Sequence, residues 1–126
     1  MSDGHYTISL DHERRLVHVI AQGEFNRDSG DELITKTLEK AAEYQYSILC
    51  DVRQLKAKVG LAEWYFLPRR LPAYRNAKTR NIKTAIVVPT GKLEKVYKFF
   101  ETVTRSLGMN IRIFLREEDA LEWLLS

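Results

Sequence analysis

Several features that define other protein classes are scarce in this sequence. Only one cysteine, Cys50, occurs in the 126 residues, so no internal disulfide can form and the fold does not depend on an oxidising compartment. No apolar stretch approaches the roughly 20 residues that span a bilayer, and the N-terminus lacks the basic and apolar regions of a secretion signal. The net charge of +3 is too small by itself to indicate nucleic acid or an anionic membrane as partner. We therefore expect a cytoplasmic protein.

The composition that is present is that of an ordinary globular domain. Hydrophobic residues make up 44% of the chain and charged residues 29%, which excludes disordered and fibrous classes. No interior segment resembles a linker, and there is no repeat or low-complexity tract. We expect a single domain that spans residues 1–126.

Hydrophobic periodicity predicts alternating strands and helices. Period-2 or short apolar runs predict strands at 6–10, 16–21, 47–52, 82–88 and 110–115. Helical spacing predicts helices that begin near Ser29, Gly60, Thr90 and Glu117, with Ser29 or Asp28 capping the first and Thr90 the third. Because Pro68 and Pro72 interrupt the second helix, it should cover about 60–67 and be kinked or broken around 68–74. The order β-β-α-β-α-β-α-β-α predicts an α/β fold with a mixed, mostly parallel five-stranded sheet that begins with a hairpin.

Four segments in this order resemble a known family. They are Ile-Leu-Cys-Asp-Val-Arg at 48–53, Leu-Ala-Glu-Trp at 61–64, Ile-Lys-Thr-Ala-Ile-Val-Val at 82–88 and Phe-Leu-Arg-Glu-Glu-Asp-Ala-Leu-Glu-Trp-Leu at 114–124. Over nearly its whole length the chain resembles the STAS domain, and more closely the SpoIIAA-like group of small bacterial proteins, which links STAS domains to CRAL-TRIO lipid-transfer domains.

The resemblance carries two functional implications, and one of them fails here. STAS antagonists are switched by phosphorylation of a Ser or Thr at the start of the second helix, but residues 48–78 contain neither, and Gly60 lies about where the acceptor would be. The SpoIIAA-like group implies instead a cytoplasmic protein, without established enzyme activity, that binds lipid-like ligands or membranes through a mobile second-helix region.

The residues themselves point to the same region. Residues 53–83 hold nine basic side chains and one acid, a net charge of +8 against −5 for the rest of the chain, and Trp64, Tyr65, Phe66 and Leu67 are consecutive within them. One helix face cannot bury all four, so at least one should face a ligand, a partner or a movable flap. We therefore expect a non-enzymatic module that binds an apolar or amphipathic anionic ligand, or a membrane surface to which the protein would attach peripherally. The expected contact residues are Trp64, Tyr65, Phe66, Arg69, Arg70, Tyr74 and Arg75.

Other interpretations of the same residues stay open. Packing and solvation alone explain much of the segment, and a STAS-type protein-interaction regulator without the phosphoserine switch is the alternative function. Nucleic acid is disfavoured as partner because the rest of the chain is acidic and no nucleic-acid motif is present. Phe99, beside the main apolar stripe of the third helix, hints at a homodimer contact.

The sequence gives little support for a catalytic site, a metal site or a bound cofactor. An enzyme would need His18, Asp51 or Tyr74 to converge in one concave site. Cys50 lies within an apolar strand and is expected to be an inert buried thiol, His18 a hydrogen-bonded sheet histidine, and Asp51 a structural hydrogen-bond acceptor. The three histidines are spaced seven and six residues apart, which does not favour a metal site, and no cofactor is expected.

Overall fold

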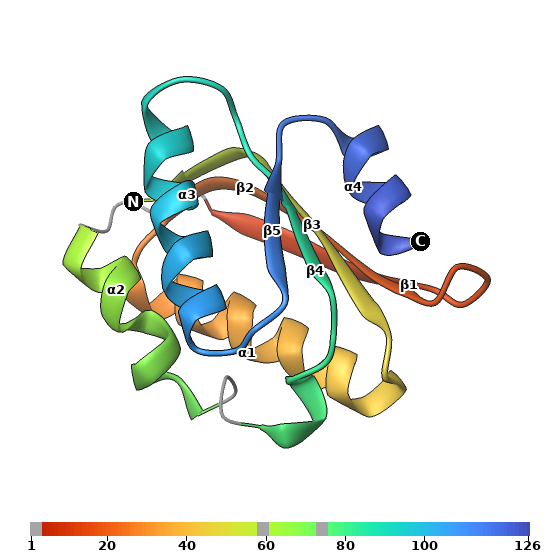
Figure 1. Cartoon of the computed structure of the whole chain (residues 1–126). Helices are drawn as coiled ribbons and strands as arrows, with labels where there is room; N and C mark the ends of the chain where they lie inside the picture. Colours follow the sequence, from red (N-terminus) through yellow and green to blue (C-terminus); the bar gives the residue numbers. More distant parts are fainter. Residues whose placement is uncertain (1–3, 58–60, 73–75) are drawn as a thin grey trace.

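The computed structural model describes residues 4–57, 61–72 and 76–126. Its five strands form one sheet in the order β1-β2-β3-β4-β5, as Figure 1 shows. β1 (His5–Asp11) pairs antiparallel with β2 (Leu16–Phe25), whereas β3 (Ser47–Ala57), β4 (Thr84–Val87) and β5 (Ile111–Phe114) are added parallel. The expected α/β fold with a mixed, mostly parallel sheet is confirmed.

The helices cover the two faces of the sheet unequally. α1 (Arg27–Tyr44), α2 (Leu61–Arg70) and α3 (Lys92–Ser106) lie on one face, and α4 (Glu117–Leu124) lies on the other (Figure 1). Alternation along the strands explains the two cores. Val17 and Ile48 pack with α1 residues, and their neighbours Leu16 and Leu49 pack with Ala120 and Leu124 of α4. No helix in the described part of the chain is long and apolar enough to cross a bilayer.

Two strands run further than the sequence predicts. β2 continues past Gly23 to Phe25, and β3 continues past Val52 to Ala57, because the two segments pair with each other beyond a bulge next to Ile20. The extension places Phe25 and Leu55 in the core of the helix-rich face.

The first and third helices begin with caps other than those predicted. Asn26, not Ser29 or Asp28, caps α1: its side chain accepts a hydrogen bond from Ser29 N at 2.9 Å, and Ser29 Oγ accepts from Asn26 N at 3.0 Å. This is a reciprocal capping box, so Ser29 is the third residue of the helix and not its cap. α3 is preceded by Gly91, with no side-chain cap, so the prediction for Thr90 is wrong.

α2 also differs from its prediction, since Pro68 lies inside the helix and the helix ends at Arg70. Leu71 N donates to the Leu67 carbonyl at 3.1 Å, which continues the helical turn past the proline. Leu67 and Leu71 are both buried and pack against Phe100 and Ile111, so tertiary contacts hold the end of the helix. A 3₁₀ turn, η2 (Ala77–Thr79), precedes β4.

Candidate ligand-binding cavity

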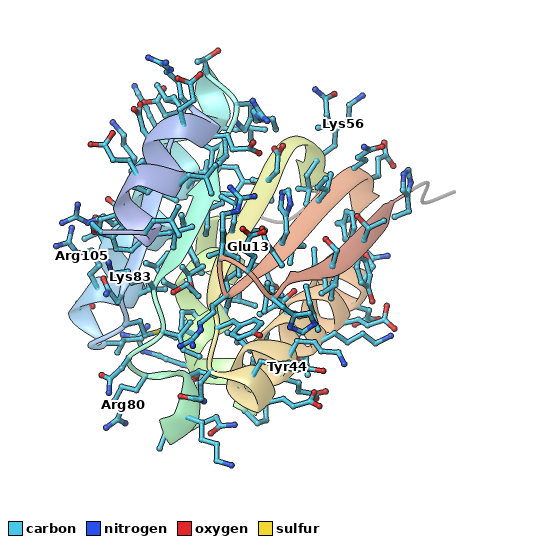
Figure 2. The ribbon with its side chains drawn as sticks, turned by 90° about the vertical axis from the view of Figure 1, so that its right-hand side faces the viewer. Glu13, Tyr44, Lys56, Arg80, Lys83 and Arg105 are labelled. Carbon is cyan, nitrogen blue, oxygen red and sulfur yellow. The ribbon has the colours of Figure 1, made fainter. Side chains whose placement is uncertain are left out.

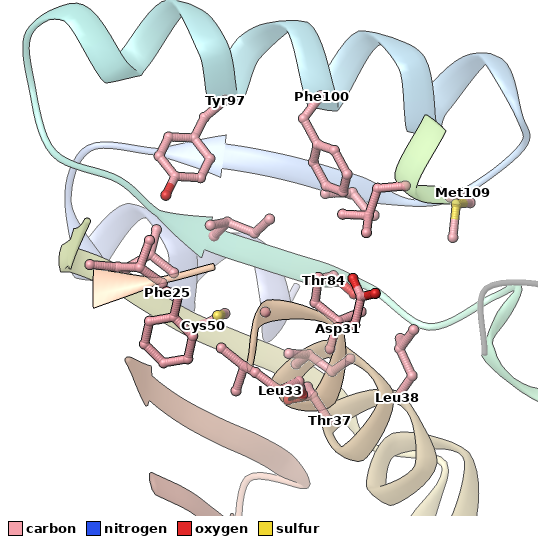
Figure 3. A pocket seen from close by; sticks show the side chains of 18 of the residues that line it. Phe25, Asp31, Leu33, Thr37, Leu38, Cys50, Thr84, Tyr97, Phe100 and Met109 are labelled. Atoms are coloured by element: carbon pink, nitrogen blue, oxygen red, sulfur yellow. Dashed lines mark hydrogen bonds between the residues drawn. The ribbon is translucent and has the colours of Figure 1, made fainter. Parts of the chain in front are cut away.

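An apolar cavity of about 160 Å³ lies between the sheet and the three helices on its crowded face. Figure 3 shows it from close by, with Tyr97 and Phe100 of α3 on one side and Leu33, Thr37 and Leu38 of α1 on the other. We call this space the apolar cavity.

The strands supply the floor of the apolar cavity. Because alternate side chains of a strand point to the same face, every second residue of β3 reaches the cavity, and the neighbouring strands contribute in the same way. The floor residues are Ile48, Cys50, Val52, Thr84, Ile86 and Ile111.

The helices supply the walls through residues one turn apart. Tyr97 and Phe100 are three positions apart on α3, and Glu63 and Leu67 are four apart on α2, so each pair projects from one helix face. The Thr37 hydroxyl donates to the Leu33 carbonyl at 2.8 Å, so this buried polar group is satisfied within α1. The walls therefore present mainly hydrocarbon and aromatic surface.

Charged groups are found at one end of the apolar cavity. Arg27 and Glu63 both line it, and Arg27 Nε lies 4.0 Å from Glu63 Oε2. Arg27 follows β2, so this end lies at the carboxyl edge of the parallel strands, whereas Asn110, directly before β5, marks the amino edge. The Arg27 and Glu63 side chains are 54% and 43% exposed, so solvent reaches this pair.

Two titratable side chains that line the cavity, the Cys50 thiol and the Tyr97 phenol, are held neutral. Burial raises the pKa of the Cys50 thiol to about 12. Burial, with a smaller contribution from Cys50, also raises the pKa of the Tyr97 phenol. Neither group ionises near neutral pH, which agrees with the expected inert thiol and leaves a cavity suited to apolar contact.

The structure places the predicted contact residues only in part. Phe66 is 54% exposed, so one of the four consecutive apolar residues does face outward as predicted, while Leu67 is buried. The Arg69 side chain is half-buried. Trp64, Tyr65 and Arg70 belong to α2, but their side chains lie outside the described part of the structure, as do Tyr74 and Arg75 entirely.

The basic residues of segment 53–83 that the structure describes do not gather in one patch. Figure 2 shows Lys56 and Arg80 at opposite ends of the molecule. Arg53 binds the Asp51 carboxylate, with its NH2 group 2.7 Å and its Nε 3.0 Å from the two oxygens, and Lys83 Nζ donates to the Trp123 carbonyl at 3.0 Å. The net charge of +8 is therefore a property of the linear sequence more than of one surface.

The other polar residues singled out in the sequence have mainly structural surroundings. Asp51 accepts hydrogen bonds from Arg53, as predicted for a structural acceptor. The prediction of a hydrogen-bonded His18 is wrong for one atom, since its Nε2 is buried without a hydrogen-bond partner in the described structure. Across residues 4–57, 61–72 and 76–126, no group of three His, Cys, Asp or Glu side chains could hold a metal ion.

Sequence reasoning missed the apolar cavity and most of its lining. It located α2 but assigned the site to aromatic and basic residues there, whereas the lining comes mainly from α1 and the strands. The apolar stripes of α1 and α3 were visible, but a stripe looks the same whether it is tightly packed or borders a space.

Comparison with solved structures supports the class of fold. The chain resembles an uncharacterised protein of the DUF3478 family with a SpoIIAA-like fold from Shewanella loihica PV-4, with a TM-score of 0.58 and 19% sequence identity over 98% of this chain and 95% of that one. The fold is therefore SpoIIAA-like, as the resemblance to that group implied. No family model and no curated protein matches the sequence.

Proposed function

We propose that this chain is a non-enzymatic binding module for an apolar or amphipathic anionic small molecule held in the apolar cavity. The cavity itself is the observation that carries the proposal, because a concave space of about 160 Å³ with mainly apolar walls and a few polar groups at a solvent-reached end is the usual form of a small-molecule site. An apolar void of roughly 150 Å³ is large enough to bind a benzene-sized molecule and stays free of water. The space therefore suits an aromatic ring or a stretch of alkyl chain.

The charged end of the apolar cavity supports the amphipathic part of the proposal. Among the described lining residues Arg27 is basic and Asp31 and Glu63 are acidic. A ligand whose alkyl chain lies along Leu67 and Phe100 would therefore bind its carboxylate to Arg27 in place of Glu63, at an end that solvent also reaches. The contact residues predicted on α2 and in the segment after it remain predictions: Trp64, Tyr65, Phe66, Arg69, Arg70, Tyr74 and Arg75.

The test is titration calorimetry with dodecanoate, comparing the native chain with Ile86→Phe. Ile86 lies in the cavity floor, so a phenyl ring there would fill part of the space. Displacing one or two methylene groups of the ligand from the cavity, at about 0.8 kcal/mol each, should weaken binding about four- to fourteenfold. Leu93→Phe, the same kind of change at an exposed site of α3, is the matched control and should leave binding unchanged. Absence of saturable binding, or equal binding by both variants, would refute the proposal.

A membrane surface is the second candidate, supported by the exposed Phe66 on α2. An aromatic side chain at this position can enter a bilayer interface while nearby basic groups meet anionic head groups. Co-sedimentation with phosphatidylglycerol and with phosphatidylcholine vesicles tests this: preferential binding to the anionic vesicles, lost in Phe66→Ser, would support it. Equal and negligible binding to both would eliminate it.

A further inference from the structure

The two edges of the sheet differ in how they are covered. At the β5 edge, Glu101 of α3 reaches the strand and its Oε2 accepts a hydrogen bond from Ile113 N at 2.6 Å. A side chain thus occupies a backbone donor that another strand would need. β5 is also short, with four residues.

The opposite edge is formed by β1, which is longer than β5. β1 is seven residues long, pairs with β2 in continuous register from His5 to Asp11, and contains no proline, lysine or bulge. These are the devices by which proteins usually prevent edge-to-edge pairing. Tyr6, Ile8 and Leu10 pack only partly against the core and remain half-buried at this edge.

From this asymmetry we infer that β1 is an interaction surface for a second copy of this chain, and that two β1 strands pair antiparallel to join two sheets into one. This inference is independent of ligand binding in the apolar cavity. A strand pair of this kind has two-fold symmetry, which is the commonest symmetry of soluble dimers.

The sequence of β1 is complementary to itself in that arrangement. Full-length antiparallel pairing places Ile8 on the two-fold axis opposite Ile8 of the other copy, and Tyr6 opposite Leu10, which covers apolar side chains that are half-buried in one copy. The same register places His5 opposite Asp11, so the imidazole and the carboxylate at the two ends of the strand face each other twice. Asp11 already binds Arg14 in its own chain at 2.7 Å and would then lie between two basic side chains.

The helix beside β1 is also suited to this symmetry. A groove between β1 and α1 is lined by Ile8, Lys36, Glu39, Lys40 and Glu43. In the joined sheet the two β2 strands would lie three strand spacings apart, about 14 Å, so the α1 helices above them would be within reach of long side chains. Each helix presents two lysines and two glutamates, which lets opposite charges meet across the axis.

The inference is tested by sedimentation equilibrium over a hundredfold range of concentration. We expect the native chain to dimerise and Ile8→Lys, which sets two like charges against each other on the axis, to weaken the dimer at least about tenfold. His5→Asp provides a second variant at an exposed position that does not endanger folding; it opposes two carboxylates and should also weaken the dimer. Thr102→Lys, on an exposed part of α3, is the matched control and should dimerise like the native chain.

Cross-linking locates the contact. Side chains directly opposite in paired strands have Cβ atoms about 5 Å apart, so oxidation of Ile8→Cys should give a disulfide-linked dimer faster than oxidation of Thr102→Cys. A chain that stays monomeric throughout, a dimer unaffected by Ile8→Lys and His5→Asp, or equal cross-linking of the two cysteine variants would overturn the inference.

Discussion

Arg27 Nε lies 4.0 Å from Glu63 Oε2, so an ion pair joins the first turn of α1 to the first turn of α2 at one end of the apolar cavity. Both side chains are about half exposed, and such pairs contribute only roughly 0.2–1 kcal/mol to folding. The pair is therefore more informative about ligand charge than about stability.

Removing Glu63 and removing Arg27 should change the affinity for an anionic ligand in opposite directions. Glu63→Gln leaves the Arg27 guanidinium without its carboxylate and should strengthen dodecanoate binding up to about fivefold, whereas Arg27→Gln should weaken it by a similar factor. Titration calorimetry measures both. Arg116→Gln, which removes a cation paired with Glu118 beside α4, is the matched control and should change nothing. If Glu63→Gln and Arg27→Gln changed the dodecanoate affinity in the same direction, Arg27 would not be the group that binds the ligand carboxylate.

Cys50 should be nearly unreactive in the folded chain. With a pKa of about 12, only about one thiol in ten thousand is ionised at pH 8, against roughly a quarter for an ordinary cysteine. Reaction with a coloured aromatic disulfide, followed by absorbance, should be more than a hundredfold slower than in urea-unfolded protein. Dodecanoate should slow it further, because Cys50 lines the apolar cavity. Fast labelling of the native chain would show that the thiol is not buried as described.

Asn26 should stabilise α1 through its capping box. Asn26→Ala removes the acceptor for Ser29 N and should lower the free energy of unfolding by about 1 kcal/mol, measured from the urea midpoint. Asn81→Ala, at an exposed turn position, should change it by less than about 0.5 kcal/mol. If the two variants unfold at the same midpoint, the cap does not contribute to stability.

Asp51 should contribute to the loss of stability in acid. Hydrogen bonds from Arg53 to the carboxylate hold the pKa of Asp51 below its ordinary value. The contribution is thus fully present above the unfolded value of about 3.9 and is lost as pH falls through the lower pKa of the folded state. Asp51→Asn should be less stable than the native chain at pH 6, and the difference should shrink as the pH falls from 5 to 2. Glu13→Gln, at an exposed turn, is the matched control, and its free energy of unfolding should change with pH as that of the native chain does. A difference in unfolding free energy between Asp51→Asn and native protein that stays constant with pH would argue against the linkage.

Local periodicity was sufficient to predict the order and type of the strands and helices. The alternation of Tyr6, Ile8 and Leu10 predicted β1, and the stripe that includes Tyr97 and Phe100 predicted α3. The ends of strands and helices were predicted less well where pairing or packing with segments distant in sequence determines them. β2 and β3 extend because they pair with each other, and α2 passes Pro68 because Leu67 and Leu71 pack on α3 and β5.

The candidate site was harder to predict for a physical reason. A cavity is the space that several elements leave when they pack together, and no single segment encodes it. The charge of the surface was hard to predict for a related reason. Arg53 counts toward a basic segment in the sequence, but in the structure it binds Asp51, two residues away. The pattern predicted that at least one of the four consecutive large side chains at 64–67 would not pack inside, since one helix face cannot bury all four, but it did not say which; in the structure Phe66 is exposed.

The space beside Cys50 and Ile86 also makes the folded chain voluminous for its mass. Hydrostatic pressure favours whichever state occupies less volume, and eliminating internal voids is a main reason that unfolding shrinks a protein solution, by roughly 20–100 mL/mol. The part of this cavity of about 160 Å³ that lies away from solvent should therefore add to the volume lost on unfolding. A molecule that occupied this space would make the fold more resistant to compression without adding a single covalent bond.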